Sequence, residues 1–337
     1  MGNKDIITLG MFIVDEFEYN HPNGEPNVEK QQNGESQIGG GGTYAIMGSR
    51  MWTSPTRLGQ IIDTGRDFDE STRKILESYE HDETNRMFIL RQDPSKPTTR
   101  ALNKYMGQRR EFKYLTERHK LHLKDYIALG VDEAKYLHSV CNPKRQTAII
   151  KEVKELGWRN VTYIYEPLPE AMTATNMDHL IETMKIDREN TLLSPNHTEA
   201  AAMLGVDEPT SSKACEELTQ AIHDYVNASK VVLRCGKLGT YVSTPDEAFW
   251  VEALHIHNQE KVLDVTGAGN AFLGGLAGGL NRYGDIRKAA ACGTISAGYT
   301  IEKDGLPCVS LVDEQECWNG RTHTAEQELD HFIKTRM

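Results

Sequence analysis

From about residue 134 onward, short β-like apolar runs alternate with helical patterns, and this alternation limits the folds that the chain can adopt. The β-like runs are KYLHSV, VTYIYEP, TLLSP and VVLRCG. Helical patterns separate them, the longest running from Ser212 to Val226. Strands that alternate with helices run parallel in one sheet, because each helix carries the chain back across a face of that sheet. We therefore predict an α/β fold in three layers, with a mostly parallel central sheet and helices on both faces.

The first third of the chain has a different character. Residues 6–14 (IITLGMFIV) form an almost continuous apolar run, as expected of a strand buried on both faces. Residues 16–38 are polar and rich in Gly, Pro and Asn, and four glycines at 39–42 then lead into a helical pattern. Between about 86 and 116, the runs MFILRQ, TTRALNKY and EFKYLT are short and broken by Pro and Gly. They predict a small antiparallel sheet outside the parallel core.

The overall charge argues against general nucleic-acid binding. The chain carries 38 Lys and Arg against 49 Asp and Glu, a formal net charge of −11. An anionic ligand therefore needs local basic side chains or helix N-termini. Six cysteines are scattered without a Cys-x-x-Cys pair, which indicates reduced thiols. The N-terminal segment contains no long apolar stretch, so we expect neither a signal peptide nor a membrane helix. We therefore expect a cytoplasmic protein.

The stretch DVTGAGNAF, residues 264–272, is the strongest candidate for a functional site. Gly267, Ala268 and Gly269 let the backbone approach a ligand closely, and an apolar helical pattern follows them. Unpaired amides and the dipole at a helix start bind anions. The alternative is a packing turn in which the glycines only permit tight contact. The stretch is neither a P-loop nor a dinucleotide-binding Gly-x-Gly-x-x-Gly motif.

These residues resemble the ribokinase-like (PfkB) family of carbohydrate and nucleoside kinases, whose C-terminal signature reads roughly D-T-x-G-A-G-D-x-F. Four further stretches resemble family elements in the same order: ITLGMFIVDEF, IGGGGTYAIMGSRM, LLSPNHTE and VVLRCGKLGTYV. The resemblance covers most of the chain. It implies one ribokinase-like domain over residues 1–337, with a nine-stranded core. It also implies a small β-sheet lid that emerges from about 16–38 and 86–116 and closes over the substrate.

The resemblance also implies roles for individual residues, with ATP and Mg²⁺ as cofactors. The implied catalytic residues of the anion-binding turn are Gly267, Ala268, Gly269 and Asn270. The implied substrate-binding residues are Asp15, Gly41, Gly42, Tyr44 and Arg100, although Arg100 is equally well explained as a solvated lid residue. The implied nucleotide-binding residues are Asn196, Glu199, Arg234, Gly236, Gly239 and Thr266, with Glu199 also a metal ligand. Relatives often form dimers through the lid, and we carry that over as an expectation.

Two departures from the family pattern are informative. The family has an aspartate, its proposed general base, where this chain has Asn270. A neutral amide holds a hydroxyl but cannot accept its proton, and loss of general-base catalysis typically costs about 10²–10⁴-fold in rate. Tyr44 stands where the family usually has a substrate-binding asparagine, so the usual sugar specificities do not transfer. Asp264, at the start of the turn, is a second group that could take part in proton removal.

The chain resembles most closely a fungal subgroup of the family, related to the maintenance-of-killer proteins, which also carries Gly-x-Gly-Asn and a Gly-Gly-Gly-Gly-Thr-Tyr turn. This favours Asn270 as the native residue over a substitution for aspartate. Three hypotheses follow. The first is an ATP- and Mg²⁺-dependent phosphotransferase that acts on a small hydroxylated metabolite. The second is a pseudokinase that binds a nucleotide or metabolite and a partner protein. The third is an enzyme of another reaction type with a phosphorylated substrate.

Overall fold

The computed structural model describes residues 3–28, 36–106, 109–168, 173 and 176–337. The strands are β1 (Ile6–Thr8), β2 (Ile13–Asn20), β3 (Gln37–Gly39), β4 (Leu58–Thr64), β5 (Phe88–Gln92), β6 (Arg100–Met106), β7 (Arg109–Tyr114), β8 (Tyr136–Cys141), β9 (Thr162–Pro167), β10 (Thr191–Leu193), β11 (Lys230–Arg234), β12 (Thr240–Ser243), β13 (Ala248–Val251), β14 (Val309–Val312) and β15 (Gln315–Trp318). The α-helices are α2 (Gly41–Arg50), α3 (Glu70–Glu77), α4 (Leu123–Ala128), α5 (Pro143–Glu155), α6 (Met177–Asp187), α7 (His197–Leu204), α8 (Ser212–Val226), α9 (Ala268–Tyr283), α10 (Ile286–Thr300) and α11 (Ala325–Arg336).

A central sheet organises the molecule. Among the described residues it has nine strands, in the order β13-β12-β11-β10-β9-β8-β1-β4-β5. The strands from β11 to β5 run parallel, whereas β12 and β13 form an antiparallel extension at one edge. The mostly parallel α/β sheet predicted from the alternating pattern is confirmed.

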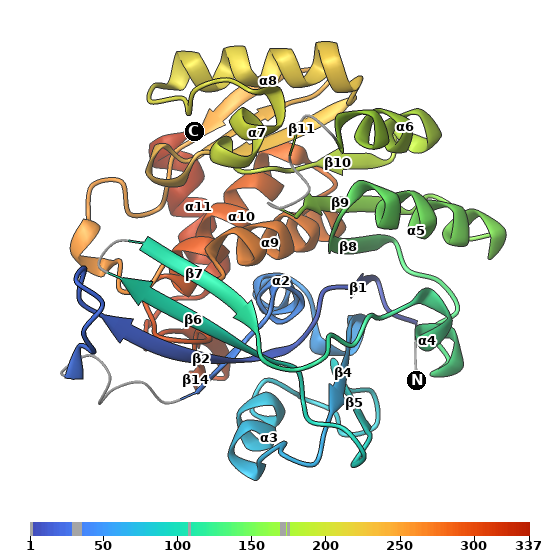
Figure 1. Cartoon of the computed structure of the whole chain (residues 1–337), viewed down its shortest axis with the longest axis vertical. Coiled ribbons are helices and arrows are strands. Elements are labelled where there is room, and N and C mark those ends of the chain that lie inside the picture. The colour runs from blue at the N-terminus through green and yellow to red at the C-terminus, as the bar shows by residue number, and fades with distance from the viewer. Residues whose placement is uncertain (1–2, 29–35, 107–108, 169–172, 174–175) are drawn as a thin grey trace.

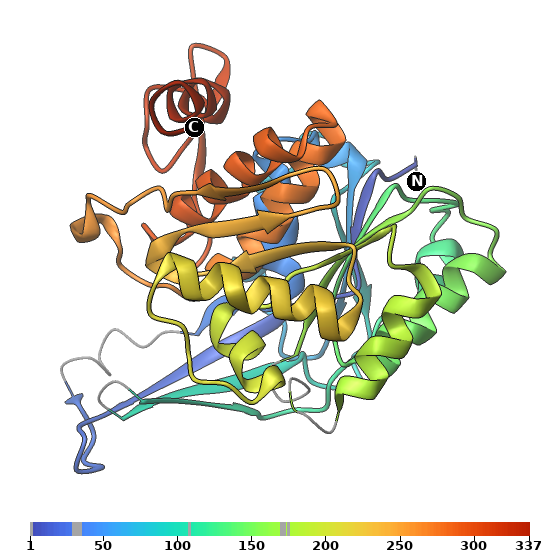
Figure 2. The same cartoon turned by 90° about the horizontal axis from the view of Figure 1, so that it is seen from above.

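Helices cover both faces of this sheet and give three layers (Figure 1). Helices α2, α9 and α10 lie on one face, and their apolar residues form one buried cluster with that face of the sheet. Helices α4 to α8 lie on the other face around a second buried cluster. Figure 2 shows the two helical layers on opposite sides of the strands. None of the described helices is long and apolar enough to cross a membrane.

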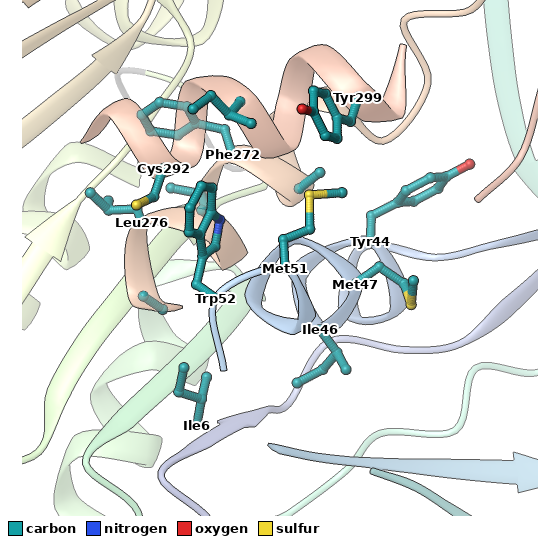
Figure 3. Close-up of a cluster of buried hydrophobic side chains, with 14 of the residues drawn as sticks. Ile6, Tyr44, Ile46, Met47, Met51, Trp52, Phe272, Leu276, Cys292 and Tyr299 are labelled. Carbon is teal, nitrogen blue, oxygen red and sulfur yellow. The ribbon is translucent and has the colours of Figure 1, made fainter. Parts of the chain in front are cut away.

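Helices α2 and α9 pack unusually closely, and this contact positions the candidate site. A Cβ on Gly274 of α9 would lie 1.7 Å from the Ala45 carbonyl oxygen of α2, so this approach requires glycine. Buried apolar side chains from both helices, among them Met47 and Phe272, belong to one cluster with Met51, which follows α2 (Figure 3). Each such side chain contributes about 1.5–3 kcal/mol when fully buried. The start of α9 is therefore held firmly against α2.

A second sheet, the lid expected from the family resemblance, stands apart from the core (Figure 1). Its four strands lie in the order β3-β2-β6-β7. It is not wholly antiparallel as predicted, because β2 and β6 run parallel to each other. Part of the predicted range 16–38, residues 29–35, lies outside the described residues, as do 107–108 within 86–116.

The apolar run at residues 6–14 is not the single strand that we predicted. Strand β1 belongs to the central sheet and β2 to the small sheet. The chain leaves the core at Gly10, where a Cβ would lie 2.7 Å from the Cα of Gly42. Apolar residues serve both sheets, so hydrophobicity alone does not reveal the break.

The prediction for MFILRQ was also wrong. These residues include β5, which pairs in parallel with β4 at the edge of the central sheet. A short strand has the same pattern in either kind of sheet. The small sheet is built from the segments further along the chain, β6 and β7, together with β2 and β3.

Candidate functional site

The first turn of α9 lies open to a cavity. The helix begins after Gly267, whose φ of 77° is in the left-handed region that favours glycine. Residues 267–270 are partly exposed, whereas 271–279 are buried. The Ala268 N–H donates to the Val265 carbonyl at 3.3 Å. The next amides of a helix have no acceptor within the helix, so those of Gly269 and Asn270 can bind an anion.

Tyr44 of α2 packs directly on this turn. A Cβ at Gly267 would lie 2.3 Å from the Tyr44 ring, which is 3% exposed. Figure 3 shows Tyr44 at the end of the apolar cluster between α2 and the layer of α9 and α10. Tyr44 therefore has a packing role against the anion-binding turn, and its contact with substrate stays a prediction.

Arg234, the last residue of β11, brings a positive charge to the same place. A Cβ at Gly269 would lie 2.1 Å from its Nη1 atom. Its Nη2 donates to the Ser194 carbonyl and to Glu166 Oε1, each at 2.9 Å, and lies 3.7 Å from Glu199 Oε2. The side chain is 11% exposed, and its Nε has no hydrogen-bond partner among the described residues. A guanidinium beside helix amides is a strong receptor for a phosphate group.

Asn270 contacts a carboxylate from β9 and the backbone of α2. Its Nδ2 donates to Oε2 of Glu166, which is 8% exposed at the end of β9. A Cβ at Gly41 would lie 3.2 Å from the same nitrogen. Glu166 thus bridges Asn270 and Arg234.

Asn196 and Glu199 form a capping box at the start of α7. The Glu199 N–H donates to Asn196 Oδ1 at 2.8 Å, and the Asn196 N–H donates to Glu199 Oε2 at 2.9 Å. This geometry explains both residue types on structural grounds. It also directs the Glu199 carboxylate toward Arg234. Three of the predicted nucleotide-binding residues, Asn196, Glu199 and Arg234, therefore lie close together.

Asp264 and Thr266 form a closed local turn before α9. The Asp264 Oδ1 atom accepts hydrogen bonds from the Thr266 N–H at 2.9 Å and from the Thr266 hydroxyl at 2.8 Å. The two side chains thus bond to each other and not to another part of the site. Nucleotide binding by Thr266 and proton removal by Asp264 both stay predictions.

A cavity of about 410 Å³ connects the predicted nucleotide-binding elements. Asn196, Arg234 and Gly269 contribute polar groups to its lining. Gly236 and Gly239 line it from the turn after β11, where both have positive φ. Apolar residues also line it, including Val262, Phe272, Ala297 and Ile301. An anion site joined to an apolar slot has the form required for a nucleotide.

The predicted substrate residues lie on strands of the small sheet or in the first turn of α2. Asp15 is 5% exposed on β2, and its Oδ2 lies 1.8 Å from the place that a Cβ on Gly39 would take. Gly41 contacts Asn270, as described above. Gly42 instead packs on Gly10, since a Cβ on Gly42 would lie 2.1 Å from the Gly10 carbonyl oxygen, and so it has a packing role.

Arg100 lies at an ion-paired position. Its Nε donates to Asp67 Oδ2 at 2.6 Å and its Nη1 to Glu16 Oε1 at 3.1 Å. Burial alone would raise the pKa of Asp67, but hydrogen bonds from Thr98 and Arg100 lower that pKa to about 2. Both carboxylates therefore already balance the charge of Arg100, and a role in binding substrate stays a prediction.

Sequence reasoning missed Glu166. The signal was its place at the end of β9, because the carboxyl ends of β9, β10 and β11 share one edge of the sheet. That edge also carries Asn196 and Arg234, whose backbones form a bridge. Glu166 precedes Asn270 by 104 residues, so no local motif joins the two.

Comparison with known proteins agrees with this fold. Residues 5–307 match the family described as pfkB family carbohydrate kinase. Protein MAK32 of Saccharomyces cerevisiae is 32% identical over 94% of this chain and 89% of its own length. Protein C16C9.01c of Schizosaccharomyces pombe is 30% identical over 95% of this chain and 91% of its own.

Solved structures share the fold. A ribokinase from Giardia lamblia superimposes with a TM-score of 0.69 at 18% identity, covering 99% of both chains. A ribokinase from Cryptococcus neoformans in complex with ADP has a TM-score of 0.64 at 16% identity, covering 90% of this chain and 96% of its own. The predicted ribokinase-like fold is confirmed, as is the similarity to the maintenance-of-killer subgroup.

Proposed function

Because the chain belongs to the pfkB family of carbohydrate kinases, we propose that it transfers the γ-phosphoryl group of ATP to a hydroxyl group of a small metabolite. The observation that carries the proposal is the meeting of three features at one point. These are the open amides at the start of α9, the Arg234 guanidinium and the Asn270 amide. Phosphoryl transfer depends mostly on positioning and on charge stabilisation, and these groups supply both.

The donor nucleotide occupies the cavity beside α9. Its phosphates lie where Gly269 and Arg234 line the cavity, within reach of the amides at the start of α9. Its base lies in the apolar slot near Val262 and Ile301. The ADP bound to the Cryptococcus neoformans ribokinase, which has the same fold, supports this choice of ligand.

Glu199 is the residue that would hold Mg²⁺. Magnesium in phosphoryl-transfer sites is usually held by one or two carboxylates together with the substrate phosphates. Glu199 fits that requirement, since it is 8% exposed and its carboxylate lies 3.7 Å from Arg234, which lines the cavity. The ion would neutralise charge on the phosphates. Arg234 supplies a further positive charge from the protein itself.

The acceptor lies on the other side of Asn270, beneath the small sheet. Asp15 and the backbone near Gly41 would bind its hydroxyl groups. The Asn270 amide orients the attacking hydroxyl but cannot take its proton. Pairing of two copies through the small sheet and a cytoplasmic location remain predictions from the family resemblance and the sequence.

The test is ADP release from ATP and Mg²⁺ across a panel of sugars, nucleosides and related alcohols. We expect at least one alcohol to stimulate release, and ADP to raise the melting temperature of the protein. Thermal stabilisation by ADP without turnover on any alcohol would refute the proposal and support a pseudokinase. Turnover with a phosphorylated substrate but not with ATP would support the third hypothesis.

A further inference from the structure

One chemical step of the proposed reaction has no residue assigned to it. The hydroxyl that attacks phosphorus must lose its proton, and the amide of Asn270 cannot accept one. We propose that Glu166, at the end of β9, accepts this proton. The inference rests on the proposed phosphotransferase function and adds the missing general base.

The contact between Glu166 and Asn270 is the first support. The Asn270 Nδ2 atom uses one N–H to donate to Glu166 Oε2. The amide keeps a second N–H and a carbonyl oxygen with which to hold a hydroxyl group. A hydroxyl held by this amide therefore lies next to the carboxylate, within reach directly or through one water.

The surroundings fix the direction of the carboxylate. The Oε1 atom of Glu166 is held by Arg234 Nη2 at 2.9 Å, so Oε2 is left facing Asn270. Gly41 also packs on this amide without a side chain of its own, and a Cβ there would come within 3.2 Å of its nitrogen. The family resemblance predicts that Gly41 binds the substrate, so a bound substrate would lie close to both Asn270 and Glu166.

Two other carboxylates near the turn make their hydrogen bonds away from Asn270. Asp264 accepts hydrogen bonds from the amide and the hydroxyl of Thr266. Glu199 accepts from the Asn196 amide and faces Arg234. Glu166 is the carboxylate that the structure brings onto Asn270.

The proposed step balances in atoms and charge. The hydroxyl O–H bond breaks and its proton goes to Glu166. The hydroxyl oxygen forms a bond to the γ-phosphorus, while the bond from that phosphorus to the bridging oxygen breaks and ADP leaves. A carboxylate is a weak base, but a loose transition state, in which the nucleophile is deprotonated late, needs no stronger one.

The experiment removes the carboxylate of Glu166 on β9 and, in one variant, places a carboxylate at position 270 on α9 instead. Turnover of ATP and Mg²⁺ is measured with the alcohol that best stimulates the wild type, for Glu166→Gln, Glu166→Asp and the double variant Glu166→Gln/Asn270→Asp. ADP affinity and thermal unfolding are measured on the same samples. Glu80→Gln serves as the control, because Glu80 is a partly buried carboxylate that instead accepts from the Met87 and Phe88 amides at 2.9 and 2.8 Å.

We expect Glu166→Gln to lower turnover by about 10²–10⁴-fold while ADP affinity is kept. The double variant should regain most of the lost rate, because it returns a carboxylate to the same contact, and Glu80→Gln should match the wild type. Glu166→Asp should fall between, which keeps the test decisive where Glu166→Gln does not fold. Wild-type turnover in Glu166→Gln or Glu166→Asp would overturn the assignment, as would a double variant no faster than Glu166→Gln. A wild type that turns over no ATP at all would instead refute the proposed function.

Discussion

Replacing Gly267 with alanine tests how tightly the anion-binding turn is held. Alanine would have to adopt the left-handed φ of Gly267, 77°, which costs a residue with a Cβ about 1–2 kcal/mol. The added Cβ would also lie 2.3 Å from the Cγ of Tyr44, well inside a normal carbon contact. Overpacking of this kind costs about 1–3 kcal/mol. We therefore expect Gly267→Ala to lower the free energy of unfolding by about 2–5 kcal/mol.

The same helix offers a matched control. Gly284 follows the last residue of α9 with a φ of 63°, and a Cβ there would meet nothing within 4 Å. Gly284→Ala should therefore show the backbone cost alone. Urea unfolding of both variants gives the steric part by difference. In a Tyr44→Ala background, the cost of Gly267→Ala should fall to that of Gly284→Ala. Equal costs for the two glycines in the wild-type background would refute the contact between the ring and the turn.

Three further predictions concern the cluster around Arg234. Arg234→Met should lower the free energy of unfolding by about 3–5 kcal/mol, because it leaves buried Glu166 without its cation. Adding Glu166→Gln should recover part of this loss. No recovery would argue against the ion pair. Asn196→Ala should cost about 1 kcal/mol through loss of the helix cap, whereas Asn196→Ser should not; equal losses in urea unfolding would contradict the capping box. Burial, and then the charge of Arg234, lower the pKa of His138 from 6.5 to about 3, so only the unfolded chain gains its proton between those pH values. Acidification from pH 7 to pH 5 should therefore remove about 2 kcal/mol of stability (1.5 pH units at 1.36 kcal/mol each), and the same loss in His138→Asn would exclude this origin.

The sequence predicted the layered sheet well because helical and strand periodicities differ strongly. Helix α8 has the same bounds that its amphipathic pattern suggested, Ser212–Val226. The break between β1 and β2 could not be seen, since both segments are apolar and the reason for the break is the distant contact of Gly10 with Gly42. Strand β5 was misplaced because a short strand does not encode its partner.

In the candidate site, too, local features could be predicted from the sequence, whereas contacts between distant segments could not. The glycine turn and the helix that follows it could be read from local sequence. The pairing of Arg234 with Glu166 could not, because it depends on which strands become neighbours. Judged alone, Asn270 indicates the loss of the family's aspartate general base. In the structure it is half of a pair with a carboxylate from β9.

A crystal structure with ADP bound gives the sharpest test of whether the start of α9 receives the nucleotide. We predict the β-phosphate at the Gly269 and Asn270 amides, with a hydrogen bond from Arg234, and adenine in the apolar slot beside Val262. Phosphates bound away from the first turn of α9, with Arg234 still paired only to Glu166 and Ser194, would refute that placement.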